Sequence, residues 1–392
     1  MGIRACALQS KAFCTLKEIY DHRDENAKKW RASGEKVVAE LGCDVPDEVL
    51  LALDIHPIRV YADPEKELKL TNVYLEYAFD PVVRAQFEKI VDETYENLAD
   101  ALVISNSTDV LIRIYLYLRE IKRVHPDSPI PQVSYIDWLF TRNRLHQNRN
   151  ELTMQLFIEE MEQLAGQKLT KEKLLKAAEI CNANRRALRK IAALREGKQV
   201  RISGSEALIL IGSAFFMDRK EHTALVLEVA EEAKSWPVIT GPRIFMTGSN
   251  QETTELYDML EETGAVIVGE DHDWGDRFFA RDYNTQLTPV HALVDCYMLR
   301  EFSSKKAFVS QRVEALNRLV DQTGAEAVLF YTNRYEEAAS WDYPSQKQSL
   351  DARNIPSVCF AKMQYPLHKN PEVREHLESF VQSMKGGSQN GR

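Results

Sequence analysis

The stretch that decides the fold starts with ALVIS at 101–105, continues through the polar turn NSTD at 106–109 and enters VLIRIYLYLREIKRV at 110–124. A short apolar run, a polar turn and a long amphipathic segment together predict a strand followed by a helix. A second apolar run, QVSYI, follows at 132–136. Because strand, turn, helix and strand in this order are typical of a doubly wound parallel unit, we predict an α/β fold.

The pattern extends toward the N-terminus, where DVPDE at 44–48 predicts a helix start with proline in the first turn. A strand is predicted after it at 57–62. Residues 15–41 are charged and helical in pattern, so we expect helix there, with Val37 and Val38 among its apolar contacts. Glu48 either compensates the helix dipole or serves as a general acid or base, and the pattern alone favours the dipole.

A second α/β unit begins near Pro242. Short apolar runs predict its strands at 243–247, 265–269, 327–331 and 357–361, with helices between them at 252–263, 310–323 and 346–354. Continuous apolar runs of this length are typical of parallel strands buried on both faces. Because parallel crossovers are right-handed, the carboxyl ends of such strands share one rim, where ligands of open α/β sheets bind.

Two loops on this predicted rim are candidate sites. The single glycine of Gly248-Ser249-Asn250 is compatible with a phosphate contact, but it is weak evidence for one, and ordinary turn geometry is the favoured interpretation. GEDHDWGDR at 269–277 surrounds one histidine with acids and has no second histidine or cysteine nearby. We therefore expect it to be a solvated loop and predict no metal site there.

Composition bounds the class of protein. The chain has 392 residues, 44% hydrophobic and 28% charged, with a net charge of -9. These values exclude a mostly disordered chain and argue against a nucleic-acid partner, which normally needs a basic face. With no apolar segment of membrane-spanning length and no signal peptide, we expect a cytoplasmic protein that does not enter the membrane.

The long-helix pattern between the two units suggests a division into four segments. We predict N-terminal helices with a first α/β domain at 1–145, a helical connecting segment at 146–236, a second α/β domain at 237–385 and a disordered tail at 386–392. Within the connecting segment, Thr170 is expected to cap a helix. The fold class is therefore two Rossmann- or flavodoxin-like doubly wound domains joined by a helical segment, with a ligand cleft between them.

The cysteines are too sparse for a disulfide scaffold, and no two of them have the spacing of a local metal motif. They are Cys6, Cys14, Cys43, Cys181, Cys296 and Cys359. Neither a Walker A sequence nor a GxSxG elbow is present, so ATP hydrolysis and a serine hydrolase are not indicated.

Several segments, taken in order, resemble the family of benzoyl-CoA reductase and 2-hydroxyacyl-CoA dehydratase subunits. They are GCDVPDE (42–48), ALVISNSTD (101–109), IPQVSYIDWL (130–139), the helical stretch 166–195, GPRIFMTGS (241–249), the stretch 262–277, GAEAVLFYTNRYE (324–336) and NIPSVCFAKMQYP (354–366). Each motif is loose by itself, but their order and spacing over about residues 35–384 make the resemblance specific.

The resemblance implies a heterodimer of two related subunits that acts on acyl-CoA thioesters through radical chemistry. It also implies a separate ATP-dependent iron–sulfur activator, and a [4Fe-4S] cluster held by three cysteines from separated strand ends. By the same resemblance Glu48 becomes a candidate catalytic residue of the cleft. Arg243, together with Gly248, Ser249 and Asn250, becomes a candidate substrate-binding residue.

This chain departs from the family at all three cluster positions. The cysteines would fall at Thr108, Ser303 and Tyr335, whose neutral hydroxyls are poor iron ligands. We therefore predict no metal or cofactor on this chain, with [4Fe-4S] clusters on the partner subunit and on the activator. Two alternatives stay open: a cluster with other ligands, such as Cys43 or Cys296, and a non-catalytic acyl-CoA-binding or assembly protein. The choice between dehydration and aromatic ring reduction also stays open.

Overall fold

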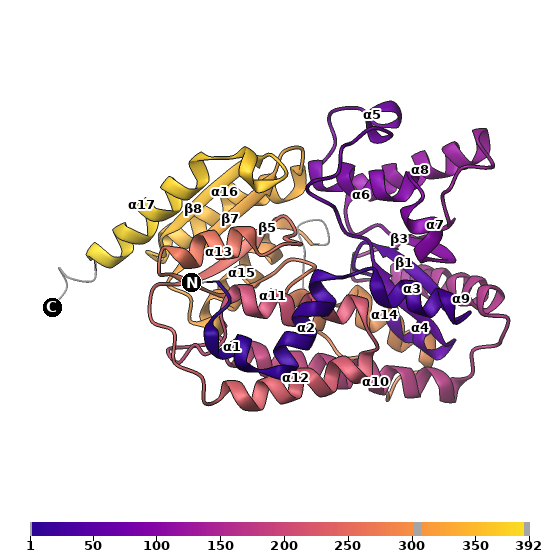
Figure 1. Ribbon diagram of the computed structural model, residues 1–392, viewed down its shortest axis with the longest axis horizontal. Coiled ribbons are helices and arrows are strands. Elements are labelled where there is room, and N and C mark those ends of the chain that lie inside the picture. The colour runs from indigo at the N-terminus through magenta and orange to yellow at the C-terminus, as the bar shows by residue number, and fades with distance from the viewer. Residues whose placement is uncertain (1, 301–306, 388–392) are drawn as a thin grey trace.

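The computed structural model describes residues 2–300 and 307–387. These residues form two four-stranded parallel sheets with helices around them, so the predicted α/β fold is confirmed. Figure 1 shows the indigo and purple first sheet in one lobe and the orange and yellow second sheet in the other, with long helices running along one side of both.

The first sheet has the strand order β2-β1-β3-β4. Its strands are β1 (Lys36–Leu41), β2 (Ile55–Arg59), β3 (Ala101–Ser105) and β4 (Gln132–Ile136). The strand β1 pairs in parallel with both β2 and β3, and Val38 lies opposite Ala101. This order is that of flavodoxin-like sheets, in which the crossovers leave β1 and β3 in opposite directions.

The strand β1 corrects one expectation, because residues 36–41 had been expected to be helical. Two helices, α2 (Lys11–Asp21) and α3 (Glu25–Ala32), occupy the preceding segment, and Gly34 then turns the chain with φ 82°. Val37 and Val38 are completely buried in the centre of the sheet. The expectation was wrong because a central strand covered on both faces shows no alternation, and the buried Glu40 interrupts its apolar run.

Five helices accompany the first sheet. They are α4 (Asp47–Ala52), α5 (Thr71–Tyr74), α6 (Pro81–Val91), α7 (Thr94–Leu98) and α8 (Asp109–Val124). The predicted helix start is present, but α4 begins at Asp47, so that Pro46 is the N-cap and does not lie in the first turn as predicted. Asp47 and Glu48 lie in that first turn. The helix α8 follows the predicted polar turn after β3.

Four helices and a 3-10 turn lie between the two sheets in the sequence. They are α9 (Arg144–Ala165), α10 (Lys171–Ala193), α11 (Gly204–Gly212), η1 (Ser213–Phe216) and α12 (Arg219–Ala233). The Thr170 side chain accepts a hydrogen bond from the Lys173 amide, which confirms the predicted cap. Met154 and Leu174 pack in one apolar cluster with Val103 of the first sheet. The helices α9 and α10 therefore share the core of that sheet.

The second sheet repeats the same topology in the order β6-β5-β7-β8. Its strands are β5 (Arg243–Gly248), β6 (Val266–Glu270), β7 (Ala327–Asn333) and β8 (Ser357–Met363). The accompanying helices are α13 (Glu255–Glu262), η2 (Asp276–Phe279), α14 (Pro289–Met298), α15 (Val309–Thr323), α16 (Glu337–Ala352), η3 (Leu367–Lys369) and α17 (Glu372–Gly387). All four predicted strands are present, and α16 begins earlier than predicted. The helix α17 includes residues 386 and 387 of the predicted tail, whose remainder lies outside the described residues.

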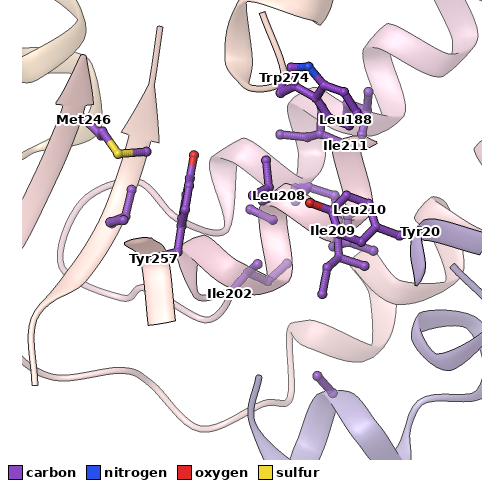
Figure 2. Packing of buried hydrophobic residues seen from close by; sticks show 14 of the residues in the cluster. Tyr20, Leu188, Ile202, Leu208, Ile209, Leu210, Ile211, Met246, Tyr257 and Trp274 are labelled. Atoms are coloured by element: carbon purple, nitrogen blue, oxygen red, sulfur yellow. The ribbon is translucent and has the colours of Figure 1, made fainter. Parts of the chain in front are cut away.

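The N-terminal segment packs against the second lobe. Helix α1 (Ala5–Gln9) precedes α2, and Arg4 forms an ion pair with Glu206 of α11 at 2.7 Å. Figure 2 shows residues 208–211 of α11 among Tyr20, Met246, Tyr257 and Trp274. Although α11 is apolar, none of the helices within 2–300 and 307–387 combines the length and the hydropathy that crossing a bilayer requires.

Candidate functional site

The carboxyl ends of both sheets face each other across a small cavity. In each sheet the crossovers reverse direction at one point, between β1 and β3 and between β5 and β7, and ligands of open α/β sheets bind at such points. Loops from both points line a shared cavity of about 60 Å³. Its walls are Leu41, Gly42, Arg59, Val60, Asp80, Val82, Val83, Gln86, Ser107, Thr108, Leu111, Ser249, Asn250, Glu252, Asp273, Trp274, Asn333 and Glu336. We call this space the interlobe cavity.

Several residues singled out from the sequence meet here. Thr108 of the first lobe and Ser249 and Asn250 of the second all line the interlobe cavity. With Gly248, the same three residues also line an adjoining space of about 30 Å³. The structure therefore brings together the turns after β3 and β5, which are far apart in the chain.

The turn after β5 requires its glycine. Gly248 has φ 125°, and a Cβ atom there would lie 2.1 Å from the Tyr331 carbonyl oxygen. The Ser249 amide donates to that same carbonyl at 2.8 Å, and the Ser249 hydroxyl accepts from the Asn333 amide at 2.9 Å. The turn is therefore fastened to β7, and it holds the Asn250 side chain against the loop after β6, where it accepts from the Asp273 amide at 2.9 Å.

Arg243 lies elsewhere. It is the first residue of β5, at the end of the strand opposite Gly248. Its guanidinium forms an ion pair with Glu326 at 3.2 Å and donates to the Gly324 carbonyl at 2.8 Å. Sequence reasoning placed Arg243 at the cleft rim, but the amino end of a parallel strand lies at the opposite edge of the sheet.

Glu48 is also separate from the interlobe cavity. Its side chain is 0% exposed, with the carboxylate paired to Arg185 of α10 at 2.7 Å and accepting from the Tyr297 hydroxyl at 2.8 Å. The neighbouring Asp47 pairs with Arg219 of α12 at 2.6 Å. The first turn of α4 is therefore held by buried cations from two other helices, an arrangement that stabilises a packing contact.

Two of the three positions where the resemblance expects cluster cysteines lie in the described residues. Thr108 precedes α8, and its buried Oγ1 atom has no hydrogen-bond partner in the part of the chain that the structure describes. Tyr335 follows β7 with φ 68° and a side chain that is 37% exposed. Ser303 lies outside the described residues. Iron–sulfur clusters are held by thiolates, so the neutral hydroxyl groups at the two described positions do not fit a cluster held there.

The cysteines are distributed over both lobes and carry no disulfide. Cys43 follows β1 at the rim, where its thiol contacts Arg277 and lies 3.6 Å from the Ser107 hydroxyl. Cys181 and Cys296 are buried in α10 and α14, and Cys359 lies in β8. Within the described ranges, no three histidine, cysteine, aspartate or glutamate side chains are grouped so that they could hold a metal ion.

The acidic loop after β6 is buried, so the expectation of a solvated loop was wrong. Glu270 is completely buried and pairs with Arg195 at 2.6 Å. Burial lowers the pKa of His272 to about 4, so its ring is neutral at pH 7. Its Nδ1 atom accepts from the Trp274 amide at 3.2 Å, and its Nε2–H group therefore donates to the Tyr257 hydroxyl at 2.8 Å. The local sequence could not show this, because Arg195 comes from a distant segment to neutralise the loop.

A network of buried arginines joins the two lobes at the rim. Arg277 pairs with Asp273 of its own lobe at 2.7 Å and with Asp44 of the first lobe at 3.1 Å. Arg300 donates to the Cys43 carbonyl at 2.9 Å, and Arg59 donates to the Asp273 carbonyl at 2.9 Å. Charges from one lobe thus compensate charges and dipoles of the other. These contacts fix how the loop after β1 faces the loop after β6.

Two carboxyl groups at the interlobe cavity were not identified from the sequence. Asp80 accepts from the Asn333 side chain at 3.3 Å, and Glu252 accepts from the Ala62 amide at 2.7 Å and from Gln86. Burial raises the pKa of Asp80 to about 6 and that of Glu252 to about 7. Both groups can therefore exchange protons near neutral pH, although no local motif marks either residue.

Comparison with known proteins agrees with the resemblance seen in the sequence. A family model described as "2-hydroxyglutaryl-CoA dehydratase, D-component" matches residues 43–384. The chain is 23% identical over 384 residues to an (R)-phenyllactyl-CoA dehydratase beta subunit from Clostridium sporogenes, covering 95% of this chain and 99% of the relative. It is 22% identical to the beta subunit of (R)-2-hydroxyglutaryl-CoA dehydratase from Acidaminococcus fermentans, covering 91% and 94%. It is 20% identical to a subunit of benzoyl-CoA reductase from Thauera aromatica, covering 58% and 60%.

Proposed function

Because this chain belongs to the 2-hydroxyglutaryl-CoA dehydratase D-component family, we propose that it is a subunit of a heteromeric enzyme acting on acyl-CoA thioesters. The dehydratase beta subunits align over more than nine-tenths of the chain, whereas the benzoyl-CoA reductase relative aligns over 58%. We therefore place dehydration of a 2-hydroxyacyl-CoA first and reduction of benzoyl-CoA second. The six unpaired cysteines support a reducing, cytoplasmic setting.

The observation that carries the proposal is the interlobe cavity, where the switch points of two flavodoxin-like sheets face each other. This is the place where α/β sheets of this kind bind ligands. Asp80 and Glu252 supply groups there that can hold or release a proton near neutral pH. Removal of a hydroxyl group as water needs such a proton donor.

We further propose that this chain is the subunit without the usual [4Fe-4S] cluster, and that a related partner subunit and an ATP-dependent activator each carry one. The neutral side chains of Thr108 and Tyr335, at positions where the family resemblance expects cysteines, support this assignment. The chain then completes the acyl-CoA cleft and the heterodimer, while electron transfer takes place on its partners.

The test is to purify this chain alone and together with its related subunit, and to measure iron per chain and the visible absorbance of each sample. We expect iron to follow the partner, and we expect turnover of a 2-hydroxyacyl-CoA to require chain, partner and activator together. Stoichiometric iron on this chain alone would contradict the assignment. If iron is found, loss of it in Cys43→Ala or Cys296→Ala, with Cys359→Ala as the matched control, would identify non-standard ligands.

The same departure from the cysteine pattern favours a second function, that of a non-catalytic acyl-CoA-binding or assembly protein. Calorimetry with an acyl-CoA and a turnover assay separate the two functions. Binding to the chain without any effect of the chain on turnover by partner and activator would select the second.

A further inference from the structure

A second pocket, of about 180 Å³, lies where the two lobes meet at the surface. It is lined by Leu68, Asn72, Tyr77, Phe79, Pro81, Arg84, Arg334, Tyr335, Gln364, Tyr365 and Lys369. The lining contains three cations and neither aspartate nor glutamate, although the net charge of the whole chain is -9. We call it the aromatic–basic pocket, and its composition indicates an anionic ligand with an aromatic part.

Two exposed tyrosines from different lobes form one wall. Tyr77 lies between α5 and α6 and Tyr335 follows β7, and their rings stand edge to face with centroids 5.9 Å apart. Tyr77 is 68% exposed and Tyr335 is 37% exposed. The Arg334 guanidinium lies over both rings, 5.4 Å and 5.0 Å from their centroids. Such aromatic and guanidinium planes form a surface on which a flat base can stack.

The cations of the pocket have two different tasks. Arg84 donates to the Glu76 carbonyl at 2.5 Å and to Asn72, and so holds the loop that carries Tyr77. Arg334 and Lys369 are exposed. Arg334 donates to the Tyr77 hydroxyl at 3.3 Å and Lys369 to the Tyr365 carbonyl at 3.2 Å, and neither forms an ion pair with a carboxylate among the described residues. Their charges are therefore available to phosphate groups, which Arg and Lys bind commonly.

The pocket also holds an unsatisfied polar group. The Tyr365 hydroxyl is buried and has no hydrogen-bond partner among residues 2–300 and 307–387. Buried polar groups are normally paired, so this hydroxyl is suited to a ligand atom. At about 180 Å³ the pocket is smaller than the ~300–1,000 Å³ typical of drug-sized ligands, so it suits one ring system with its phosphates at the mouth.

The aromatic–basic pocket adjoins the interlobe cavity through two pairs of neighbours in sequence. Phe79 and Arg334 line the pocket, while the next residue, Asp80, and the preceding residue, Asn333, line the cavity. Asp80 and Asn333 are hydrogen-bonded to each other at the boundary. The aromatic–basic pocket and the interlobe cavity are therefore neighbours at the junction of the lobes.

We propose that the aromatic–basic pocket binds the adenosine–phosphate end of the acyl-CoA substrate, with the base stacked on Tyr77 and Tyr335 and the phosphates held by Arg334 and Lys369. The inference rests on the proposed function, since it names where that function's substrate is anchored. It also gives Tyr335 a role of its own at a position where the family resemblance expects a cluster cysteine.

The experiment is calorimetry of the full chain with three probes: CoA, adenosine 3′,5′-bisphosphate, and pantetheine, which lacks the nucleotide. We expect the first two to bind and pantetheine not to bind. Arg334→Ala and Tyr335→Ala should each weaken binding of the bisphosphate about tenfold or more, which corresponds to about 1.4 kcal/mol. Tyr335→Phe keeps the ring and should bind like the wild type. Arg374→Ala removes an exposed arginine of α17 and is the matched control.

Unchanged bisphosphate affinity in folded Arg334→Ala and Tyr335→Ala proteins, or binding of pantetheine alone, would overturn the proposal. If the two variants no longer bind the partner subunit, and the wild type binds no nucleotide, the pocket is a protein interface and the proposal is wrong. Turnover with an unchanged KM in Tyr335→Ala would refute the site and leave the proposed function standing. Bisphosphate binding by a chain that does not support turnover would leave the site standing and refute the proposed function.

Discussion

At the residue scale, Glu48 shows that the role of a carboxylate depends on the side chains that surround it. The pattern alone favoured a helix-dipole charge over an acid–base group, and the family resemblance made Glu48 a candidate catalytic residue of the cleft. In the structure the side chain is enclosed by Arg185 and Tyr297, outside the lining of the interlobe cavity. This placement supports a role in packing α4 against α10 and α14.

Replacing Glu48 by glutamine should therefore destabilise the protein, because the buried Arg185 charge loses its partner. We expect the free energy of unfolding to fall by about 3–5 kcal/mol, measured by urea denaturation. Glu378→Gln, at an exposed position of α17, should change it by less than about 0.5 kcal/mol. Unchanged stability combined with loss of acyl-CoA turnover would instead identify Glu48 as a catalytic residue.

The contribution of Glu252 to the free energy of unfolding should depend on pH. Burial raises its pKa from 4.5 to about 7, so the folded protein keeps this proton over a pH range in which the unfolded chain releases it. Its contribution to stability is therefore complete below pH 4.5 and is lost as the pH rises through about 7. Glu252→Gln cannot lose the proton, and the variant should gain about 3 kcal/mol relative to wild type between pH 4.5 and 8.

The measurement is the difference in free energy of unfolding between Glu252→Gln and wild type at several pH values. The buried His272, whose pKa is lowered to about 4, destabilises both proteins equally as the pH falls below 6.5, and its effect cancels in the difference. A difference that does not vary with pH would show that Glu252 ionises normally in the folded protein.

At the element scale, α11 shows how a short helix can organise a lobe. All its residues are buried, and it packs against the second sheet and against the N-terminal helices. Its start is defined by a capping box, in which the Ser203 hydroxyl accepts from the Glu206 amide and the Glu206 carboxylate accepts from the Ser203 amide. Glu206 also binds Arg4, so the cap links the chain's beginning to the core.

Ser203→Ala should remove one half of this box and leave the Glu206 amide unpaired in a buried place. We expect a loss of about 1–2 kcal/mol in the free energy of unfolding, seen as a lower denaturation midpoint. Ser383→Ala, on the exposed face of α17, removes a hydroxyl that caps no helix start and serves as the control. Equal midpoints for the two variants would contradict a stabilising role for the cap.

At the scale of the whole molecule, the two lobes are joined by buried ion pairs in addition to apolar packing. Arg277 touches the first lobe at Cys43 and Asp44 and its own lobe at Asp273. Since each of these partners belongs to a loop at the carboxyl end of a strand, the bridge sets the geometry of the interlobe cavity itself.

Arg277→Met should therefore loosen the junction while both sheets remain folded. We expect faster amide hydrogen exchange in residues 42–46 and 271–277, with the protection of β3 and β7 retained. Arg353→Met removes a cation whose partners, Asp321 and Asn317, lie within the second lobe, and it should leave both loops unchanged. Identical exchange in the two variants would show that apolar packing alone fixes the lobes.

The local sequence was sufficient for elements whose signals are contiguous. The strands β3 and β4, a helix start near Pro46 and the Thr170 cap were all predicted, because propensity, capping and turn chemistry depend on neighbours in the chain. The strand β1 was missed because its burial on both faces is a property of the sheet and leaves no alternation in the sequence.

By itself, the sequence determined that this protein has two parallel α/β units, that it resembles one family, and that it lacks cysteine where this resemblance expects cluster ligands. Only the tertiary structure decided which residues share a site. It moved Arg243 and Glu48 away from the interlobe cavity, brought Asp80 to Asn333 and Tyr77 to Tyr335, and buried the acidic loop after β6 against Arg195. The physical reason is that burial, charge compensation and pKa depend on distances in space between segments far apart in the chain, and local pattern does not encode those distances.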